Sequence, residues 1–271
     1  FYHTLNTNVT LIESFPNILP IEDTDISKEL EKIFKKRKMN ILTNSLVEKI
    51  EKSNSGVKIH VKDGDVIKAE QALLAIGVQG NIENLGLNKC GIKTEQGWIK
   101  VNNYLETSQP NIYAIGDVAG PPWLAHVASA EGITAVEHLA GMNPAPMEYG
   151  NIPGCTYCHP EVASVGLTEN AALEAGYDIK IGSFPFRGLG KALATGQTEG
   201  FVKVIYDAKY GEMLGCHILG AEATNLITEV VIARNLETTY HEVLKTIHPH
   251  PTLSEAIMEA TANAFGEAIH I

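Results

Sequence analysis

The stretch His248-Pro-His-Pro-Thr-Leu-Ser-Glu255 combines residue types that could exchange protons with a substrate. Histidine is the side chain whose charge changes most readily near neutral pH. A carboxylate bonded to one ring nitrogen fixes the tautomer and leaves the other nitrogen able to act as a base. A histidine of this stretch and Glu255 could form such a pair, and we expect Thr252 or Ser254 to cap the helix that contains Glu255. The same residue types also suit a proline-rich surface turn before an amphipathic helix.

Two further candidate residues are acids that follow predicted strands. Asp117 comes after the apolar segment 111–116 and its terminal glycine, at the edge where open α/β sheets bind their ligands. A helix predicted from about Ala125 offers backbone N–H groups and the positive end of its dipole. Glu13 closes the strand 9–12, a position where dinucleotide-binding folds hold the ribose of adenosine. A loop-capping aspartate and a surface glutamate explain these two residues equally well.

Cys155 and Cys158 have the spacing of a thioredoxin-like redox pair, and His159 beside them suggests zinc. A structural zinc site needs four ligands, and the sequence has no second pair at a suitable spacing. The pair also lacks the strand-to-helix setting in which a thiol of low pKa is expected. We interpret the two residues as structural thiols and predict no metal site.

Composition narrows the class of protein. A formal charge of −11 makes the phosphate backbone of a nucleic acid an unfavourable partner. We see no signal peptide and no apolar run of the roughly 20 residues that span a bilayer, so we expect no membrane association. Four cysteines in 271 residues do not suggest a disulfide framework. We expect a cytoplasmic (bacterial) or mitochondrial-matrix location, and favour the bacterial cytoplasm. The first residue, Phe1, suggests a start that is not the natural one.

The N-terminal part has the pattern of a doubly wound α/β unit whose beginning is missing. A strand over 9–12 is followed by an amphipathic helix over 25–38. A hairpin is predicted around residues 57–67, and the apolar segment 72–77 suits a strand buried in a parallel sheet.

The rest of the chain changes character twice. A strand over 111–116 and a helix over 125–139 precede a proline-rich linker at 143–146. Beyond residue 152 strands alternate irregularly with helices, which predicts an α+β domain. The clearest strands there are 201–206 and 213–219, and the clearest helices are 222–235 and 254–265.

These motifs resemble the dihydrolipoamide dehydrogenase family, within the class I pyridine nucleotide-disulfide oxidoreductases. The resemblance covers the chain from its first residue to its last, and matches the C-terminal portion of such enzymes. It implies that His250 is the catalytic base, that Glu255 orients it, and that His248 is only a neighbour. Relatives of the glutathione reductase type share His-Pro-Thr but usually lack the Leu-Ser-Glu ending.

The resemblance also implies cofactor sites for FAD and NAD. Asp117 would bind the flavin ribitol, and Glu13 the adenosine ribose of NAD. Val47 would lie near the adenine, and Gly77 near the nicotinamide nucleotide. The backbone along the isoalloxazine ring would come from Trp123, Leu124, Ala125 and His126. Family members often read Gly-Arg-x-Pro-Asn where this chain has Gly77-Val-Gln-Gly-Asn81, so an expected arginine is missing.

The implied architecture has three parts. A partial NAD-binding domain (1–77) lacks its Gly-rich turn, a central segment (78–147) faces FAD, and an interface domain (148–271) forms a homodimer. The implied reaction is oxidation of dihydrolipoamide with NAD⁺, and a lipoyl domain of a 2-oxo acid dehydrogenase complex would be a partner. The family's Cys-x-x-x-x-Cys pair and first FAD-binding glycine motif are not in this sequence, so we expect the chain alone to be inactive. The alternatives are a stand-alone dimerisation or interaction module, and a related flavoprotein disulfide reductase.

Overall fold

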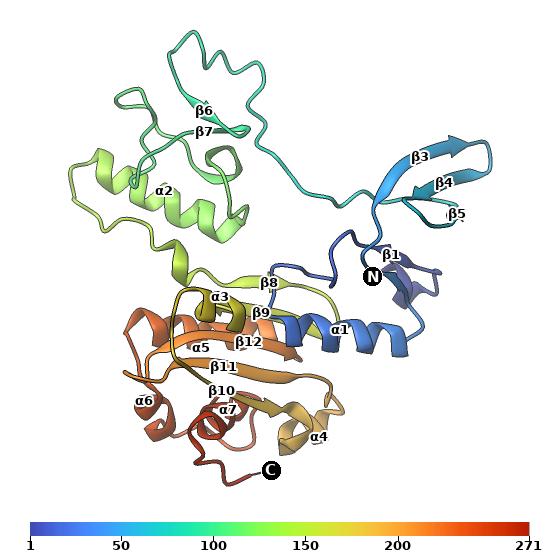
Figure 1. The fold of residues 1–271 in the computed structure, drawn as a ribbon. Helices are drawn as coiled ribbons and strands as arrows, with labels where there is room; N and C mark the ends of the chain where they lie inside the picture. Colours follow the sequence, from blue (N-terminus) through green and yellow to red (C-terminus); the bar gives the residue numbers. More distant parts are fainter. Residues whose placement is uncertain (271) are drawn as a thin grey trace. The chain divides into compact units, whose positions relative to one another are not determined.

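A computed structural model of the chain describes residues 1–270 (Figure 1). The chain forms two compact units, which are described separately. Unit 1 contains Phe1–Ala72 and Gly150–Ile271, and unit 2 contains Leu73–Tyr149. The predicted three-part division has boundaries at residues 77 and 147 and stays a prediction. The two compact units divide the chain differently, because the first 72 residues cluster with the C-terminal part.

A five-stranded antiparallel sheet with the order β10-β11-β12-β9-β8 forms the centre of unit 1 (Figure 1). Its two central strands are buried along almost their whole length, which suits their apolar residues. Its strands are β8 (Gly154–Thr156), β9 (Glu161–Gly166), β10 (Ile179–Pro185), β11 (Phe201–Asp207) and β12 (Met213–Gly220).

The two faces of this sheet follow the alternation of side chains along each strand. Val202, Val204 and Tyr206 of β11 share one core with the helices α5 (Ala223–Asn235) and α7 (Glu255–Phe265). Gly182 allows α7 to approach β10, since a Cβ at this position would lie 1.9 Å from the carbonyl oxygen of Ala260. The opposite face of the sheet packs against other helices.

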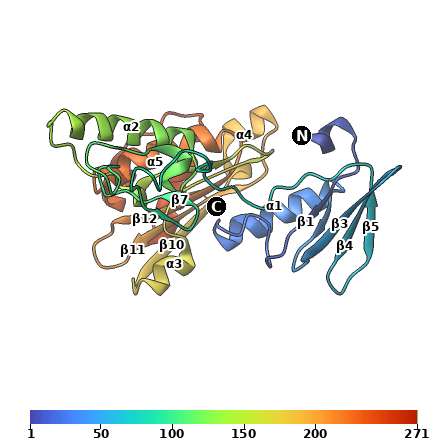
Figure 2. The same ribbon diagram turned by 90° about the horizontal axis from the view of Figure 1, so that it is seen from above.

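The longer helix on the opposite face of the sheet is α1 (Thr24–Lys36), which begins at the N-cap Asp23 (Figure 2). Its residues Ile26, Leu30 and Ile33 recur at helical spacing and are buried with Val162 and Leu219 of the sheet. The short helix α3 (Glu169–Glu174) buries Ala172 with Ile205 and Leu214.

The N-terminal part of unit 1 contains two small sheets. The parallel pair β1 (Thr10–Ile12) and β2 (Asn40–Leu42) is connected through α1, as in a βαβ unit. The second sheet is antiparallel, with β3 (Val47–Ser53), β4 (Gly56–Val61) and β5 (Val66–Ala69) in that order. It confirms the predicted hairpin.

Unit 2 is smaller. The hairpin β6 (Thr94–Glu95) and β7 (Trp98–Ile99), the 3-10 turn η2 (Gly116–Ala119) and the helix α2 (Ala125–Leu139) are its regular elements. Ile92, Ile99 and Ala114 form its core. The remaining short helices of the chain are η1 (Tyr2–Leu5), η3 (Tyr149–Asn151), η4 (Phe186–Gly188), α4 (Gly190–Thr195) and α6 (Tyr240–Lys245). Within residues 1–270 no helix is both long enough and apolar enough to cross a bilayer.

Two predicted strands are wrong. Segment 72–77 forms no strand, and Leu73 and Ile76 are 82% and 91% exposed. An apolar strand of this kind needs neighbouring strands on both sides, and the parallel sheet formed within residues 1–270 contains only β1 and β2. Segment 111–116 is also not a strand, because its pairing is limited to an isolated bridge between Tyr113 and Glu106.

Candidate active site

The structure brings His250 and Glu255 together. Nδ1 of His250 lies 2.8 Å from one carboxylate oxygen of Glu255, across the turn that precedes α7. The other oxygen accepts the backbone N–H of Thr252, also at 2.8 Å. The His250 side chain is 74% exposed and that of Glu255 is 16% exposed, so an accessible imidazole rests on a largely buried carboxylate.

The charge of Glu255 decides the tautomer of His250. Burial opposes the charged carboxylate, but the hydrogen bonds from Thr252 and His250 outweigh it, so the pKa of Glu255 lies below its ordinary value. An ionised carboxylate can only accept hydrogen bonds. Nδ1 of His250 therefore carries the proton, and Nε2 of the neutral ring has a lone pair available for a substrate proton.

The predicted side-chain cap of α7 is not formed. Ser254 is the N-cap residue, but its side chain makes no capping bond. The Thr252 hydroxyl donates to the carbonyl of Pro249 at 2.8 Å and lies 3.1 Å from the Ser254 hydroxyl. These hydroxyls tie the turn together while Glu255 itself receives the backbone N–H of Thr252, which explains why the cap prediction is wrong.

Asp117 is exposed in the turn η2 of unit 2. The turn begins at Gly116, whose φ of 71° favours glycine. The backbone N–H of Gly116 donates to one oxygen of the buried Glu131 carboxylate at 2.6 Å. The Tyr149 hydroxyl donates to the other oxygen of that carboxylate at 2.8 Å. Burial and the adjacent Glu131 raise the pKa of Tyr149. Glu131 could not be recognised from the sequence, since an acid inside a helix usually faces solvent.

The predicted isoalloxazine-facing stretch spans the start of α2. Trp123 is 36% exposed, and Leu124 is the N-cap residue and provides no side-chain cap. Ala125 and His126, both exposed, form the first turn. The first N–H groups of a helix and its dipole favour an electron-rich partner, so this geometry suits the role that the resemblance implies.

The candidate NAD residues fall in both units. Glu13 follows β1, and one of its carboxylate oxygens accepts the Phe15 N–H at 2.9 Å and the Ser14 hydroxyl at 3.1 Å. Its backbone carbonyl accepts the N–H of Ser45 at 2.9 Å, which places it close to Val47 at the start of β3. Gly77 belongs to unit 2, where its φ is 130° and a Cβ would meet no atom within 4 Å.

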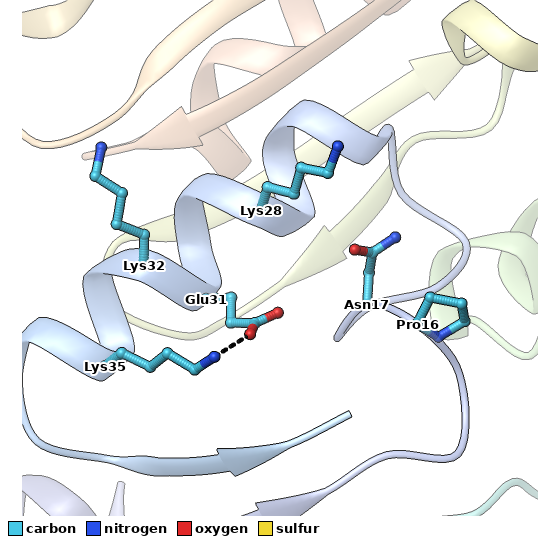
Figure 3. A pocket seen from close by; sticks show the side chains of 6 residues that line it. All are labelled: Pro16, Asn17, Lys28, Glu31, Lys32 and Lys35. Carbon is cyan, nitrogen blue, oxygen red and sulfur yellow. Dashed lines mark hydrogen bonds and ion pairs between the residues drawn. The ribbon is translucent and has the colours of Figure 1, made fainter. Parts of the chain in front are cut away.

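A pocket on the surface of α1 involves none of the predicted site residues (Figure 3). It lies between the loop after β1 and the exposed face of α1, where the Lys35 ammonium pairs with Glu31 at 2.6 Å. Its lining residues are Pro16, Asn17, Lys28, Glu31, Lys32 and Lys35.

The two closely spaced cysteines are free thiols that are partly buried. Burial raises the pKa of both Cys155 and Cys158, which opposes formation of a reactive thiolate. In the part of the chain that the structure describes, no group of three or more potential metal ligands gathers. The raised pKa values favour the structural interpretation of the pair over a redox role.

Comparison with known proteins defines the class. Residues 1–132 match the pyridine nucleotide-disulphide oxidoreductase family, and residues 152–261 match the dimerisation domain of the same family. The chain belongs to the pyridine nucleotide-disulphide oxidoreductases, as its motifs predict. Proteins of this family use FAD and NAD.

Individual relatives refine this picture. The chain is 49% identical to the dihydrolipoyl dehydrogenase of Rhizobium etli, over 100% of the chain and 57% of that protein. Its fold matches the crystal structure of LpdA from Mycobacterium tuberculosis with a TM-score of 0.89 and 28% identity, over 96% of this chain and 57% of that one. The Cu(II) complex of the HOCl-induced flavoprotein disulfide reductase RclA from Escherichia coli gives a TM-score of 0.90 and 26% identity, over 96% and 59%. The chain thus spans little more than half the length of these relatives.

Proposed function

We propose that this chain is the C-terminal portion of a dihydrolipoamide dehydrogenase, in which His250 is the base that accepts a thiol proton. The His250–Glu255 hydrogen bond of 2.8 Å is the observation on which the proposal depends. The overall reaction is dihydrolipoamide plus NAD⁺ giving lipoamide, NADH and a proton. The likeness to dihydrolipoyl dehydrogenases at 49% identity supports this choice of substrate.

The role of the chain's own residues follows from the site. Nε2 of His250 takes the proton of a substrate thiol, and Glu255 stabilises the resulting imidazolium. The substrate thiolate then attacks a disulfide, which breaks that disulfide and releases one of its sulfurs as a thiolate. The cysteine pair of that disulfide lies outside this sequence, so the chain alone is expected to be inactive.

The residues present fit the two cofactors of the family. The exposed carboxylate of Asp117, in a turn fixed by Glu131, would accept hydrogen bonds from the ribitol of FAD. The second oxygen of Glu13 and the open space at Gly77 suit the adenosine ribose and the nicotinamide nucleotide of NAD. When bound, FAD passes the electrons of the substrate to NAD⁺.

The proposed partners are a second copy of the chain and a lipoyl domain of a 2-oxo acid dehydrogenase complex. The match of residues 152–261 to a dimerisation domain supports the homodimer. In this family the base acts at the flavin and disulfide of the partner subunit, and the accessible His250 suits that arrangement. We place the enzyme in the bacterial cytoplasm.

A second candidate is a flavoprotein disulfide reductase with another substrate, which the fold similarity to RclA favours. The higher identity to dihydrolipoyl dehydrogenases and the Leu253-Ser254-Glu255 ending argue against it. A stand-alone dimerisation module is a third candidate, and the intact His250–Glu255 pair argues against it.

A substrate comparison separates these candidates. The assay uses the completed enzyme, in which residues 1–271 follow the N-terminal part that the curated relatives carry. We expect NAD⁺ reduction with dihydrolipoamide and none with reduced glutathione. Turnover with glutathione alone would favour the second candidate, and a flavin-loaded protein without either activity would favour the module.

A further inference from the structure

The second histidine of the motif, His248, has the opposite environment to His250. Its side chain is only 5% exposed. Nε2 lies 2.9 Å from a carboxylate oxygen of Glu229 on α5, and Nδ1 lies 3.1 Å from the carbonyl oxygen of Thr246. The imidazole ring of His248 is therefore held between α5 and its own loop, directly before Pro249.

Both partners of His248 can only accept hydrogen bonds. A carbonyl oxygen has no proton to donate, and neither has an ionised carboxylate. A neutral imidazole carries one N–H and could satisfy only one of these partners, whereas the imidazolium satisfies both. The hydrogen bond to Glu229 is the main cause that raises the pKa of His248 above its ordinary value, although burial opposes the charge.

The charge on His248 also acts on Glu255, the carboxylate that orients the base. Glu255 favours the charged form of His248, and His248 in turn lowers the pKa of Glu255. The charged groups that act on His248 thus come from α5 (Glu229) and from the start of α7 (Glu255). Glu229 also acts electrostatically on the thiol of Cys216 on β12, which is fully buried and whose pKa burial raises, so that thiol stays neutral.

We propose that His248 and Glu229 form a positioning pair, which fixes the loop bearing His250 against α5 and so holds Nδ1 of His250 on the Glu255 carboxylate. His248 itself need not touch the substrate. Its consequence for catalysis rests on the proposed function, whereas its charge state and its coupling to Glu229 are properties of this chain alone.

The first experiment measures that charge state without any activity. Two-bond ¹H–¹⁵N correlation spectra of the ¹⁵N-labelled chain, recorded against pH, report whether each ring nitrogen carries a proton. We expect both ring nitrogens of His248 to carry a proton at pH 7, and we expect the ring to lose one of them at a higher pH than an ordinary histidine does. In Glu229→Gln the pKa of His248 should fall by roughly one unit. Glu229 is 43% exposed, so this replacement spares the core, and His270, paired with Glu259, serves as an internal reference.

The second experiment measures the catalytic consequence in the completed enzyme. His248→Gln removes a positive charge near His250, which makes protonation of the base easier. The acid limb of kcat/KM for dihydrolipoamide should therefore move to higher pH by about half a unit. Glu229→Gln removes a negative charge instead, so it should not move the limb to higher pH. The double variant, which lacks both charges, should lie near the wild-type limb, since the two residues act as a pair. A loss of fold alone would lower the amplitude without moving the limb.

The outcomes separate this inference from the proposed function. A neutral His248 at pH 7, a His248 pKa that ignores Glu229→Gln, or an acid limb that neither variant moves would overturn the positioning pair. Turnover that survives His250→Gln would overturn the proposed function and would leave the spectra of His248 unchanged.

Discussion

Glu255 holds two donors at the same distance, the imidazole Nδ1 of His250 and the backbone N–H of Thr252, each 2.8 Å from a separate carboxylate oxygen. The second bond anchors the carboxylate to the turn, so that the first can orient an imidazole that is largely exposed to solvent. The orientation of the exposed imidazole thus depends on the anchored carboxylate of Glu255.

Glu255→Gln tests this orientation. An amide retains an oxygen for the Thr252 N–H, but it no longer stabilises a positive charge on His250. We expect kcat/KM for dihydrolipoamide in the completed enzyme to fall by about 10² or more, with flavin content unchanged. Wild-type activity in this variant would show that His250 needs no orienting acid.

The lowered pKa of Glu255 sets the direction of a pH effect on stability. Because the folded pKa lies below the unfolded one, the stabilisation is present above the ordinary value of 4.5 and is lost as pH falls through the folded value. Glu255→Gln should therefore flatten the acid side of the stability profile, measured by urea unfolding between pH 3 and 7 (about the range in which carboxylates titrate). An unchanged profile would contradict the assignment.

Glu131→Ala should destabilise unit 2 selectively. It leaves the Gly116 N–H and the Tyr149 hydroxyl without their acceptor, and the cost of losing hydrogen bonds to a buried charge is about 2–3 kcal/mol. The chain's two tryptophans, Trp98 and Trp123, both lie in unit 2, so urea unfolding followed by tryptophan fluorescence reports on this unit. Tyr149→Phe is the matched control and should cost about 1 kcal/mol. Equal effects of the two variants would argue against Glu131 as the anchor of the turn.

Lys203 offers the corresponding test in unit 1. Its buried ammonium lies 2.9 Å from Asp23, 2.6 Å from Asp25 and 2.6 Å from Glu169. Lys203→Met leaves Asp23 buried without its counter-ion, and we expect a loss of about 3–5 kcal/mol in urea unfolding followed by circular dichroism. Asp25→Asn, at an exposed carboxylate, should cost less than about 1 kcal/mol. A Lys203→Met protein as stable as wild type would show that the cluster contributes no net stability.

The same cluster predicts sensitivity to acid. Burial opposes the charge on Asp23, but the bonds from Lys203 and the backbone N–H groups of Glu169 and Asp25 outweigh it and lower its pKa. The stabilisation is therefore present above the ordinary aspartate range and is lost as pH falls through the lower folded value. In Lys203→Met this acid-dependent loss should be smaller than in wild type.

The periodic elements could be predicted from the sequence, and the long-range contacts could not. Helix α2 begins and ends at the predicted residues, because its apolar spacing and the flanking Pro-rich and Gly segments are local signals. The strand predicted for segment 72–77 was wrong, because burial of such a strand depends on neighbouring strands that its own residues do not specify. Lys203 and Asp23 are 180 residues apart, so their contact requires the packing of α1 on the sheet.

In the candidate active site, too, the contact between residues close in sequence could be predicted and the long-range contact could not. The motif around His250 led to the pair with Glu255, whose residues lie close together in the sequence. The anchor Glu229, 19 residues before His248, was missed. An acid on a helix carries no local sign that it meets a histidine from a later loop.

Thiol reactivity tests the interpretation of the cysteines. Cys90 is exposed, Cys155 and Cys158 are partly buried, and Cys216 is buried. With a chromogenic disulfide reagent we expect one thiol to react quickly in the native chain, the close pair slowly, and Cys216 only after unfolding. Rapid reaction of Cys155 and Cys158, or their loss as a disulfide under mild oxidation, would support the redox interpretation instead.

The steady-state rate of dihydrolipoamide oxidation by the completed enzyme carrying His250→Gln tests whether His250 is the base. The matched control is His270→Gln, because His270 is also exposed and also bonds a glutamate, Glu259, through Nδ1. We predict that His250→Gln keeps its flavin and loses activity by at least about 10³, whereas His270→Gln keeps wild-type turnover. Full turnover with His250→Gln would contradict the assignment of the base.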